Sequence, residues 1–285
     1  MKPKATILII GGAEDRGNKE MKEHRVDNGQ YERFEILKDL LPKKGRKHII
    51  EIIMTASSVP EEMQKMYLKA FKEIGFSDIG FIDIKDKAEA READFCMRME
   101  KAHAVFFSGG DQFKLASILG GTQSMQVIRD KYLHDKDFIV AGTSAGAMAI
   151  PNLMICQGGE HEAMLKDDIQ IASGLGILDS CIVDTHFIKR GRFGRLAHAV
   201  VMNPEVLGIG LGEDTALIIK NGSDAECRGS GMVVIIDGNQ ILSTNITEIG
   251  NDDPIFVENL KVDILAKGSK FSIKDRKMAV KKLKM

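Results

Sequence analysis

The stretch that decides the fold of this 285-residue chain is Phe138-Ile139-Val140-Ala141-Gly142-Thr143-Ser144-Ala145-Gly146-Ala147. Its apolar start predicts a buried strand over 138–141, and its small residues predict a helix that begins at Ala145. The five residues from Gly142 match the G-x-S-x-G pattern of a nucleophile elbow, a sharp strand-to-helix turn that exposes a serine hydroxyl. Such a turn needs small residues because its backbone is strained and neighbouring chains approach closely. On this motif alone, Ser144 is either a nucleophile or the N-cap of the following helix.

Short β-branched segments alternate with helix-length segments through the first 150 residues. This alternation predicts a parallel sheet covered on both faces, with ligands bound beyond the carboxyl ends of the strands. After Asp179 further strands flank a helix. The chain is expected to be a single domain over 1–285, in which residues 222–285 form mostly short strands and hairpins. The expected strands are Ile7–Ile10, Ile49–Met54, Ile79–Ile82, Ala104–Phe107, Phe138–Ala141, Cys181–Val183, Val206–Leu211, Ala216–Ile219 and Met232–Ile236.

One segment, Pro60 to Ile74, has the marks of an amphipathic helix at both ends. Ser58 stands three residues before Glu61, which is the spacing of a capping box, and Gly75 is a favoured helix stop. Its apolar stripe is expected to face the core rather than a cofactor. The stripe consists of Met63, Met66, Ala70, Phe71 and Ile74.

Composition and charge narrow the class of protein. Hydrophobic residues make up 44% and charged residues 28% of the chain, and 40 basic side chains oppose 41 acidic ones. Such a balance is that of an average globular protein and implies no basic surface for nucleic acid. The apolar run Ala5–Ile10 is too short for a signal-peptide core, and no stretch reaches the roughly 18 apolar residues of a membrane span. We expect a cytoplasmic protein with no nucleic-acid or membrane partner.

The cysteines and His161 are the candidate metal or redox ligands. The four cysteines form no C-x-x-C pair and are expected to be reduced and mostly buried. His161 lies between Glu160 and Glu162, but no third spaced ligand accompanies it, so no metal is expected. The cysteines are Cys96, Cys156, Cys181 and Cys227.

A serine nucleophile needs a base that takes its proton and a third group that orients the base. His186 follows the apolar run Cys181–Val183, where a strand meets the expected catalytic edge, and is the candidate base; a core histidine is the alternative. Glu213 follows the glycine-rich end of the strand at 206–211 and is the candidate orienting acid; an ordinary turn carboxylate is the alternative. Other acids considered are Asp179, Asp184 and Asp214, while His24, His103, His134 and His198 are expected to be surface or hydrogen-bonded histidines.

Acyl transfer also needs hydrogen-bond donors for the developing oxyanion. The backbone N–H of Ala145 is one candidate. The turn Ser108-Gly109-Gly110-Asp111 can supply a second from Gly110, although the same residues also suit an ordinary turn.

Five segments taken in order resemble the cyanophycinases of the S51 serine peptidase family. The resemblance covers about residues 5–280, and the ordered set of motifs is highly specific. These segments are Ile9-Ile10-Gly11-Gly12-Ala13-Glu14-Asp15, Ser108-Gly109-Gly110-Asp111-Gln112, Gly142-Thr143-Ser144-Ala145-Gly146-Ala147, Asp184-Thr185-His186-Phe187 and Gly208 to Thr215.

The resemblance implies a Ser-His-Glu triad at Ser144, His186 and Glu213, with no cofactor. It also implies a class I glutamine amidotransferase-like (flavodoxin-like) fold, which is an α/β three-layer sandwich with a mostly parallel central sheet, here with extra C-terminal strands. The implied activity is exo-hydrolysis of cyanophycin to β-Asp-Arg dipeptides, and the implied assembly is a homodimer.

A substrate that carries carboxylates and guanidinium groups calls for both signs of charge in its pocket. The resemblance places Gln112 and Asp184 in that pocket, together with arginines in the pattern H-F-x-x-R-x-R-x-x-R after His186. An arginine fork suits a carboxylate, although a solvated basic helix face explains Arg195 better than Arg190 and Arg192. Thr185 departs from the glutamine that the family commonly has before the catalytic histidine, which puts subsite detail in doubt.

Three alternatives stay open beside this interpretation. One is the sister branch of the family, dipeptidases that cleave after an amino-terminal α-aspartate; the spacing Arg190-x-Arg192 and the loop Gly12–Asp15 favour cyanophycinase. Another is a catalytically silent binding protein on the same fold, which the intact triad argues against. Finally, the basic tail could bind an acidic partner, although a solvated terminus is expected. The tail residues are Lys274, Arg276, Lys277, Lys281, Lys282 and Lys284.

Overall fold

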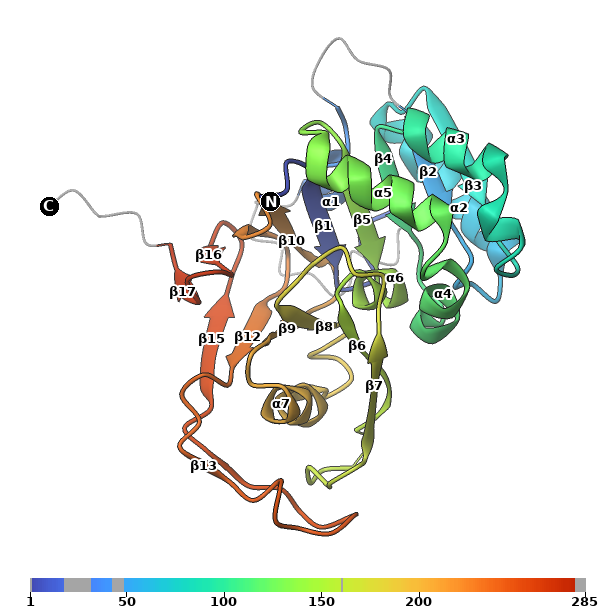
Figure 1. The fold of residues 1–285 in the computed structure, drawn as a ribbon. Helices are drawn as coiled ribbons and strands as arrows, with labels where there is room; N and C mark the ends of the chain where they lie inside the picture. Colours follow the sequence, from blue (N-terminus) through green and yellow to red (C-terminus); the bar gives the residue numbers. More distant parts are fainter. Residues whose placement is uncertain (1, 18–31, 43–48, 160, 280–285) are drawn as a thin grey trace, which may run out of the picture.

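The computed structural model describes residues 2–17, 32–42, 49–159 and 161–279 (Figure 1). Within these ranges the largest sheet has nine strands in the order β17-β16-β11-β10-β1-β5-β4-β2-β3, and a second sheet has four in the order β15-β12-β9-β8. Two further pairs of strands, β6 with β7 and β13 with β14, form small ribbons. Figure 1 shows helices on both sides of the main sheet and α7 beside the second one.

The part of the main sheet that runs from β1 to β3 is parallel, so the carboxyl ends of its strands meet at one edge. From β1 outward in the other direction, each strand is antiparallel to its neighbour. The strands are β1 (Thr6–Ile10), β2 (Ile49–Ile53), β3 (Asp78–Ile82), β4 (Ala104–Phe107), β5 (Ile139–Thr143), β10 (Thr215–Lys220), β11 (Asp224–Gly229), β16 (Lys270–Ser272) and β17 (Lys277–Met278).

Strand β1 shows why the main sheet is covered on both faces. Ile7 and Ile9 lie in one apolar cluster together with residues of α3, α4 and α5, whereas Leu8 and Ile10 lie in another together with residues of α1 and α2. Successive side chains of a strand point to opposite faces, so an unbroken apolar run needs cover on both. The predicted α/β class is confirmed. The helices are α1 (Glu35–Lys38), α2 (Pro60–Ile74), the 3₁₀ turn η2 (Glu89–Arg91), α3 (Ala93–Lys101), α4 (Gln112–Leu119), α5 (Gln123–His134), α6 (Ala145–Ala149) and α7 (Phe193–Met202).

The strands predicted after Asp179 are all present. The one at Ala216–Ile219 joins the main sheet as β10, whereas the other three pair in the second sheet, which the sequence did not reveal. One face of this sheet, which includes Ile209, joins the cluster that contains Ile7 of β1. The other face, which includes Val234, packs on Leu196 of α7. The elements are β6 (Leu153–Gly158), β7 (Ile169–Ser173), β8 (Cys181–Asp184), β9 (Leu207–Leu211), β12 (Val233–Asp237), β13 (Ser243–Thr244), β14 (Val257–Glu258) and β15 (Lys261–Leu265).

Helix α2 confirms the predicted bounds and corrects the predicted cap. It covers Pro60–Ile74 and stops at Gly75, whose φ of 109° is in the left-handed region that glycine tolerates. The capping-box prediction for Ser58 is wrong: the N-cap is Val59, which receives no side-chain cap bond, and the hydroxyl of Ser57 accepts from the Val59 N–H instead. A proline at the first helical position already lacks one of the N–H groups that a cap would satisfy.

The cysteines and the basic tail take ordinary structural positions. Cys96, Cys181 and Cys227 are buried, Cys156 is half-buried, and all four are free thiols. In the tail, Arg276 forms an ion pair with Asp237 at 2.6 Å, so the expectation of a solvated side chain is wrong for this residue. The tail positions Lys281, Lys282 and Lys284 lie outside the described residues. Across the helices that the structure describes, none is both long and apolar enough to cross a membrane.

Candidate active site

The loops that follow β1, β5, β8 and β9 meet at the carboxyl edge of the parallel strands. Backbone carbonyls at the end of β1 and in the turn after it accept hydrogen bonds from the other three loops. The carbonyl of Ile10 accepts the Ser144 N–H at 3.0 Å, that of Gly11 accepts the His186 N–H at 2.8 Å, and that of Gly12 accepts the Asp214 N–H at 2.9 Å. Three chain segments far apart in sequence are therefore fixed to three consecutive carbonyls.

Gly12 is required at this junction for a steric reason as well. Its φ is +93°, and a Cβ atom there would lie 2.4 Å from Nε2 and Cε1 of the His186 ring. Any larger residue would therefore displace the imidazole or the turn.

Ser144 occupies the elbow turn that the sequence predicts. Its φ and ψ are 52° and −122°, a strained combination for a residue with a side chain. A Cβ on Gly142 would lie 2.6 Å from the backbone of Gly146, which explains the small residues of the motif. Although Ser144 precedes α6 in the N-cap position, its hydroxyl makes no cap bond to the described backbone. The helix-cap alternative for this hydroxyl is therefore wrong.

A continuous hydrogen-bonded chain links Ser144, His186 and Glu213. Ser144 Oγ lies 3.0 Å from His186 Nε2, and His186 Nδ1 lies 2.7 Å from Glu213 Oε1. With the ring proton on Nδ1 donated to Glu213, Nε2 is left to accept the serine O–H. This arrangement can remove a proton from the serine hydroxyl and stabilise the resulting imidazolium.

The protonation of this chain is set by burial and by nearby charges. Burial lowers the pKa of His186; Glu213 opposes that shift, and the cations of Arg190 and Arg192 reinforce it. Burial alone would raise the pKa of Glu213, but hydrogen bonds from His186 and Lys189 bring that pKa below its ordinary value. At neutral pH the imidazole is therefore neutral and the carboxylate charged, which is the state a general base requires.

Lys189 is a member of this site that the sequence did not single out. Its Nζ donates to Glu213 Oε2 at 3.0 Å, on the oxygen that His186 leaves free. The lysine side chain is 67% exposed, so solvent screens this ion pair. Lys189 lies three residues after His186, which is close enough in sequence to suggest a place in the same site. Nothing in the sequence, however, shows that Lys189 contacts Glu213.

Glu14 belongs to the first of the five family motifs, and its buried side chain lies behind the elbow. Its carboxylate accepts from Tyr67 Oη at 2.7 Å and from Thr143 Oγ1 at 2.5 Å. Burial, then the charge of Glu14, raises the pKa of Tyr67 well above its ordinary value, so this phenol stays a hydrogen-bond donor. Glu14 therefore ties α2 to the residue immediately before Ser144.

Four of the eleven described non-glycine residues with positive φ lie at this site. Ala13, Ser144, His186 and Asp214 all have φ between 48° and 52°, although none is glycine. Each such residue costs about 1–3 kcal/mol and persists only where surrounding contacts hold it. Here the hydrogen bonds to the turn after β1 supply that restraint for three of the four residues.

The turn Ser108-Gly109-Gly110 lies beside the elbow. A Cβ on Gly109 would be 3.4 Å from the Cβ of Ser144, so this turn lies against the Ser144 side chain. Gly110 has a φ of +141°. The oxyanion roles of the Gly110 and Ala145 N–H groups stay predictions.

The pocket residues predicted after β8 divide into buried and exposed members. Asp184 is fully buried and accepts from Arg195 Nε and Nη2 at 2.5 Å each and from Arg192 Nη1 at 3.2 Å. Arg195 is 9% exposed, so the solvated-face alternative for it is wrong. Arg190 is exposed. Asp184 and Arg195 therefore form a buried support beneath a surface that carries Arg190 and part of Arg192.

Arg192 is half-buried and contacts both Asp184 and the segment that leads to His186. It donates to the carbonyl of Thr185 at 2.8 Å, and its side chain is 16% exposed. Burial lowers the pKa of Arg192 to about 10, although Asp184 opposes the shift. The guanidinium remains charged at neutral pH.

Thr185 is buried and Gln112 is half-buried, and their roles in substrate binding stay predictions. Thr185 is 1% exposed, and within the described residues its hydroxyl has no hydrogen-bond partner. Gln112 Nε2 donates to the carbonyls of Ile155 and Cys156, at 3.0 and 2.7 Å, and so ties α4 to β6. Only the Gln112 carbonyl oxygen is left for other partners.

The remaining histidines give one correction. His198 is buried, and its Nε2 finds no hydrogen-bond partner in the part of the chain that the structure describes, so the expectation of a surface or satisfied histidine is wrong. Burial lowers its pKa. His161 contacts Asp168 at 3.1 Å, and among the described side chains no group of three could hold a metal ion. His24 and Glu160 lie outside the described residues.

Comparisons with known proteins agree with these features. A model of peptidase family S51 matches residues 23–226, a range that includes Ser144, His186 and Glu213. A cyanophycinase of Trichormus variabilis is 34% identical over 274 residues, which are 96% of this chain and 87% of the relative. A cyanophycinase of Geminocystis herdmanii is also 34% identical, over 276 residues that cover 95% and 94% of the two chains.

A solved structure supports the fold. A peptidase from an acI-B1 Actinobacterium superposes with a TM-score of 0.65 at 20% identity, over 95% of this chain and 98% of that one. At this identity the likeness concerns the arrangement of helices and strands.

Proposed function

Because this chain belongs to peptidase family S51, a family of serine-type peptidases, we propose that it hydrolyses cyanophycin. Cyanophycin has a poly-aspartate backbone with arginine attached to each side-chain carboxyl, and the proposed products are β-Asp-Arg dipeptides. The observation that carries the proposal is the hydrogen-bonded chain from Ser144 through His186 to Glu213, in a protein 34% identical to cyanophycinases over nearly its full length.

In the proposed acylation step, His186 Nε2 takes the Ser144 proton as Oγ attacks an aspartyl carbonyl carbon. The negative charge then develops on the carbonyl oxygen, and the N–H groups of Gly110 and Ala145 are the proposed donors to it. As the C–N bond breaks, the imidazolium gives its proton to the departing amine. An acyl-enzyme on Ser144 remains.

In the deacylation step, His186 takes a proton from water, and the resulting hydroxide attacks the acyl carbon. Collapse of this second tetrahedral intermediate breaks the bond to Oγ, and His186 returns the proton to Ser144. Glu213 stays ionised throughout and holds the imidazole orientation, since its second oxygen is bound by Lys189.

Charge supports the choice of substrate. Arg190 is exposed beside the triad, and Arg192 is anchored beneath it by Asp184 and the Thr185 carbonyl. An arginine fork binds a carboxylate through two parallel hydrogen bonds. We assign to Arg190 and Arg192 the binding of substrate carboxylates, and to Asp184 and Arg195 the support of that surface. Gln112 and Thr185 are assigned to the pocket wall.

Release of dipeptide from purified cyanophycin tests the proposal. Ser144→Ala is expected to lower the rate by about 10⁶-fold, because the other triad members cannot act without the nucleophile. Ser58→Ala is the matched control, since Ser58 is exposed and caps no helix. Residual turnover of Ser144→Ala near the level of the intact protein would exclude the mechanism, and faster turnover of Asp-Leu than of cyanophycin would favour an α-aspartyl dipeptidase.

A homodimer and a cytoplasmic location belong to the same proposal. Light scattering on the eluting protein checks the assembly, because a dimer has twice the 31.4 kDa mass of the chain. Fractionation of the host cells checks the location.

A further inference from the structure

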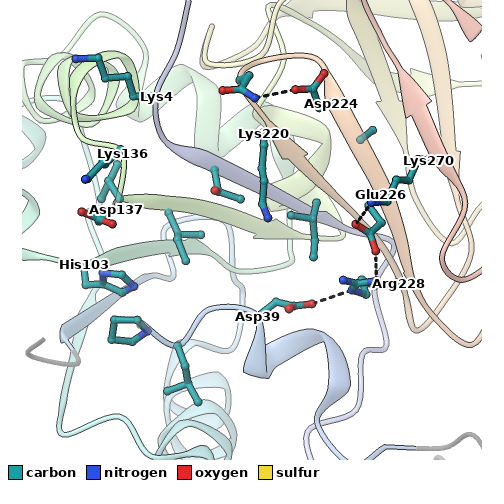
Figure 2. Close-up of a pocket in the computed structure, with 18 residues that line it drawn as sticks. Lys4, Asp39, His103, Lys136, Asp137, Lys220, Asp224, Glu226, Arg228 and Lys270 are labelled. Atoms are coloured by element: carbon teal, nitrogen blue, oxygen red, sulfur yellow. Dashed lines mark hydrogen bonds and ion pairs between the residues drawn. The ribbon is translucent and has the colours of Figure 1, made fainter. Parts of the chain in front are cut away.

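A charged pocket lies at the opposite edge of the main sheet from Ser144. Its volume is about 510 Å³, and it is lined by residues at the amino ends of β1 and β5 and by residues along β10 and β11 (Figure 2). A strand rises about 3.3 Å per residue, so five-residue strands separate this pocket from the catalytic loops by about 17 Å. We call this pocket the amino-edge basin.

The floor of the basin is one face of the sheet. Ile218 of β10 lies in the apolar cluster that α1 and α2 cover, and Lys220, two residues further along the strand, points to the same face. Glu226 pairs with Ile218, and Lys270 pairs with Glu226. Residues paired across strands share a face. The charged side chains of the basin therefore lie on the same face of the sheet as the cluster under α1 and α2, next to the edge of that cluster.

One wall of the basin is an ion-pair network that leaves carboxylate oxygens accessible. Arg228 lies 3.6 Å from Asp39 and 2.5 Å from Glu226, and Lys270 lies 3.6 Å from the other oxygen of Glu226. The side chains of Asp39 and Glu226 are 33% and 28% exposed. A carboxylate can accept about four hydrogen bonds, so both acids retain capacity for a further cationic donor.

The rest of the basin carries charge of both signs, with Lys136 and Lys220 beside Asp137 and Asp224. Lys220 also lies near enough to Asp39 to act on the pKa of that carboxyl. Within residues 2–17, 32–42, 49–159 and 161–279, neither Lys136 nor Lys220 has an ion-pair or hydrogen-bond partner for its ammonium group. Figure 2 shows Lys220 pointing into the pocket, between a side that carries Lys136 and a side that carries Arg228 and Glu226. Two ammonium groups that form no hydrogen bond or close ion pair with the described residues favour a ligand with carboxylates.

The charged surface continues beyond this pocket. A neighbouring hollow of about 700 Å³ shares Asn221 and Asp224 with it and is lined further on by Lys274 and Asp275. Alternating charge over two adjoining hollows fits an extended ligand better than a single small ion. Lys274 belongs to the basic tail, which takes no part in the proposed catalytic mechanism.

We propose that the amino-edge basin is a second, non-catalytic binding site for aspartyl-arginine units, with Lys136 and Lys220 on carboxylates and Asp39 and Glu226 on guanidinium groups. This inference rests on the proposed function, because it takes the ligand chemistry from the substrate assigned to Ser144. The unit can come from the polymer or from the released dipeptide. A polymer held at both edges raises the effective concentration of chain at the catalytic loops, as any second attachment does.

Lysine footprinting tests the site directly. The Ser144→Ala protein is reductively methylated alone, with purified cyanophycin and with β-Asp-Arg dipeptide, and each lysine is read by peptide mass spectrometry. Lys136 and Lys220 are expected to be protected, whereas Lys65 and Lys69, exposed on α2, are not. Protection by both ligands indicates a site of one unit, and protection by the polymer alone indicates a site for the extended chain. Protection by neither overturns the proposal.

Sedimentation with insoluble cyanophycin supplies the second measurement. Lys136→Gln/Lys220→Gln in the Ser144→Ala background is expected to partition to the granules about fivefold less, since two exposed charge contacts are lost. Lys65→Gln/Lys69→Gln removes the same charge elsewhere and is the control. Equal losses in the two double variants would show non-specific attraction and overturn the site.

The two proposals can fail separately. With Ser144 intact, Lys136→Gln/Lys220→Gln is expected to release dipeptide from short soluble aspartyl-arginine oligomers at the unaltered rate. If the intact protein releases no dipeptide from any such substrate, the proposed function fails, while footprinting of Ser144→Ala still reports on the basin. If dipeptide is released but Lys136 and Lys220 are unprotected, only the basin inference fails.

Discussion

Replacing Asp184 with asparagine removes the negative charge that two arginines share beside the active site. Asp184 is fully buried, and Arg195 and Arg192 donate three hydrogen bonds to it. The variant keeps the side-chain shape but leaves the guanidinium of Arg195, which is 9% exposed, without an anion. Breaking a buried ion pair in this way costs about 3–5 kcal/mol of folding stability. For a chain of this size the melting temperature should fall by about 10 °C.

Thermal unfolding followed by circular dichroism measures this loss, with Asp263→Asn as the control. Asp263 pairs with Lys261 at 3.0 Å, but the two side chains are 25% and 34% exposed, so the control should lose less than about 1 kcal/mol. Hydrolysis is then assayed well below both melting temperatures. If Asp184→Asn were as stable as Asp263→Asn and only its KM for cyanophycin rose, Asp184 would be a substrate contact and the buried-support argument would be refuted.

Three further predictions concern the triad. Glu213→Gln should lower kcat by about 10⁴-fold with little change in KM, because the imidazole loses the partner that fixes its tautomer; an unchanged kcat in steady-state kinetics would contradict this. Since burial lowers the pKa of His186 and the neutral ring is the active form, kcat/KM should rise with pH through a value below 6.5, and Arg190→Gln should move this limb to higher pH by removing a cation. A pH profile in which the limb stays in place would count against that coupling. Gly12→Ala should abolish activity, because its Cβ would lie 2.4 Å from the His186 ring; a fully active, folded variant would disprove the steric argument.

Local patterns were enough to predict the elements that carry the chemistry. The apolar run before Gly142 and the small residues after it predicted the strand, turn and helix around Ser144, and the structure has β5, the turn and α6 there. Residues adjacent in the chain set this geometry, so their order is sufficient evidence for it. The same holds for α2 and its stop at Gly75.

Predictions that depended on burial were less successful. Arg195 was expected to be solvated if it lay on a basic helix face, and His198 was expected to be exposed or satisfied, yet both are buried. Whether a polar residue on a helix faces water depends on what packs against that helix. Arg195 is covered by the end of the β6 strand, since a Cβ on Gly159 would lie 2.1 Å from the Cβ of Arg195. His198 lies near the charges of Asp168 and Asp167, beside β7. Both covering segments come well before α7 in the chain, so the sequence of the helix alone does not reveal them.

By itself, the sequence determined the α/β class, the elbow at Ser144 and the ordered set of motifs that leads to His186 and Glu213. Only the tertiary structure decided that three consecutive carbonyls, from the last residue of β1 onward, accept the N–H groups of Ser144, His186 and Asp214. The same holds for the hydrogen bond from Thr143 to Glu14, which spans 129 residues of chain. Strand and turn patterns are written in neighbouring residues, so one stretch of sequence reveals them. Contacts between distant segments depend on how the whole sheet pairs and packs, and no single stretch contains that information.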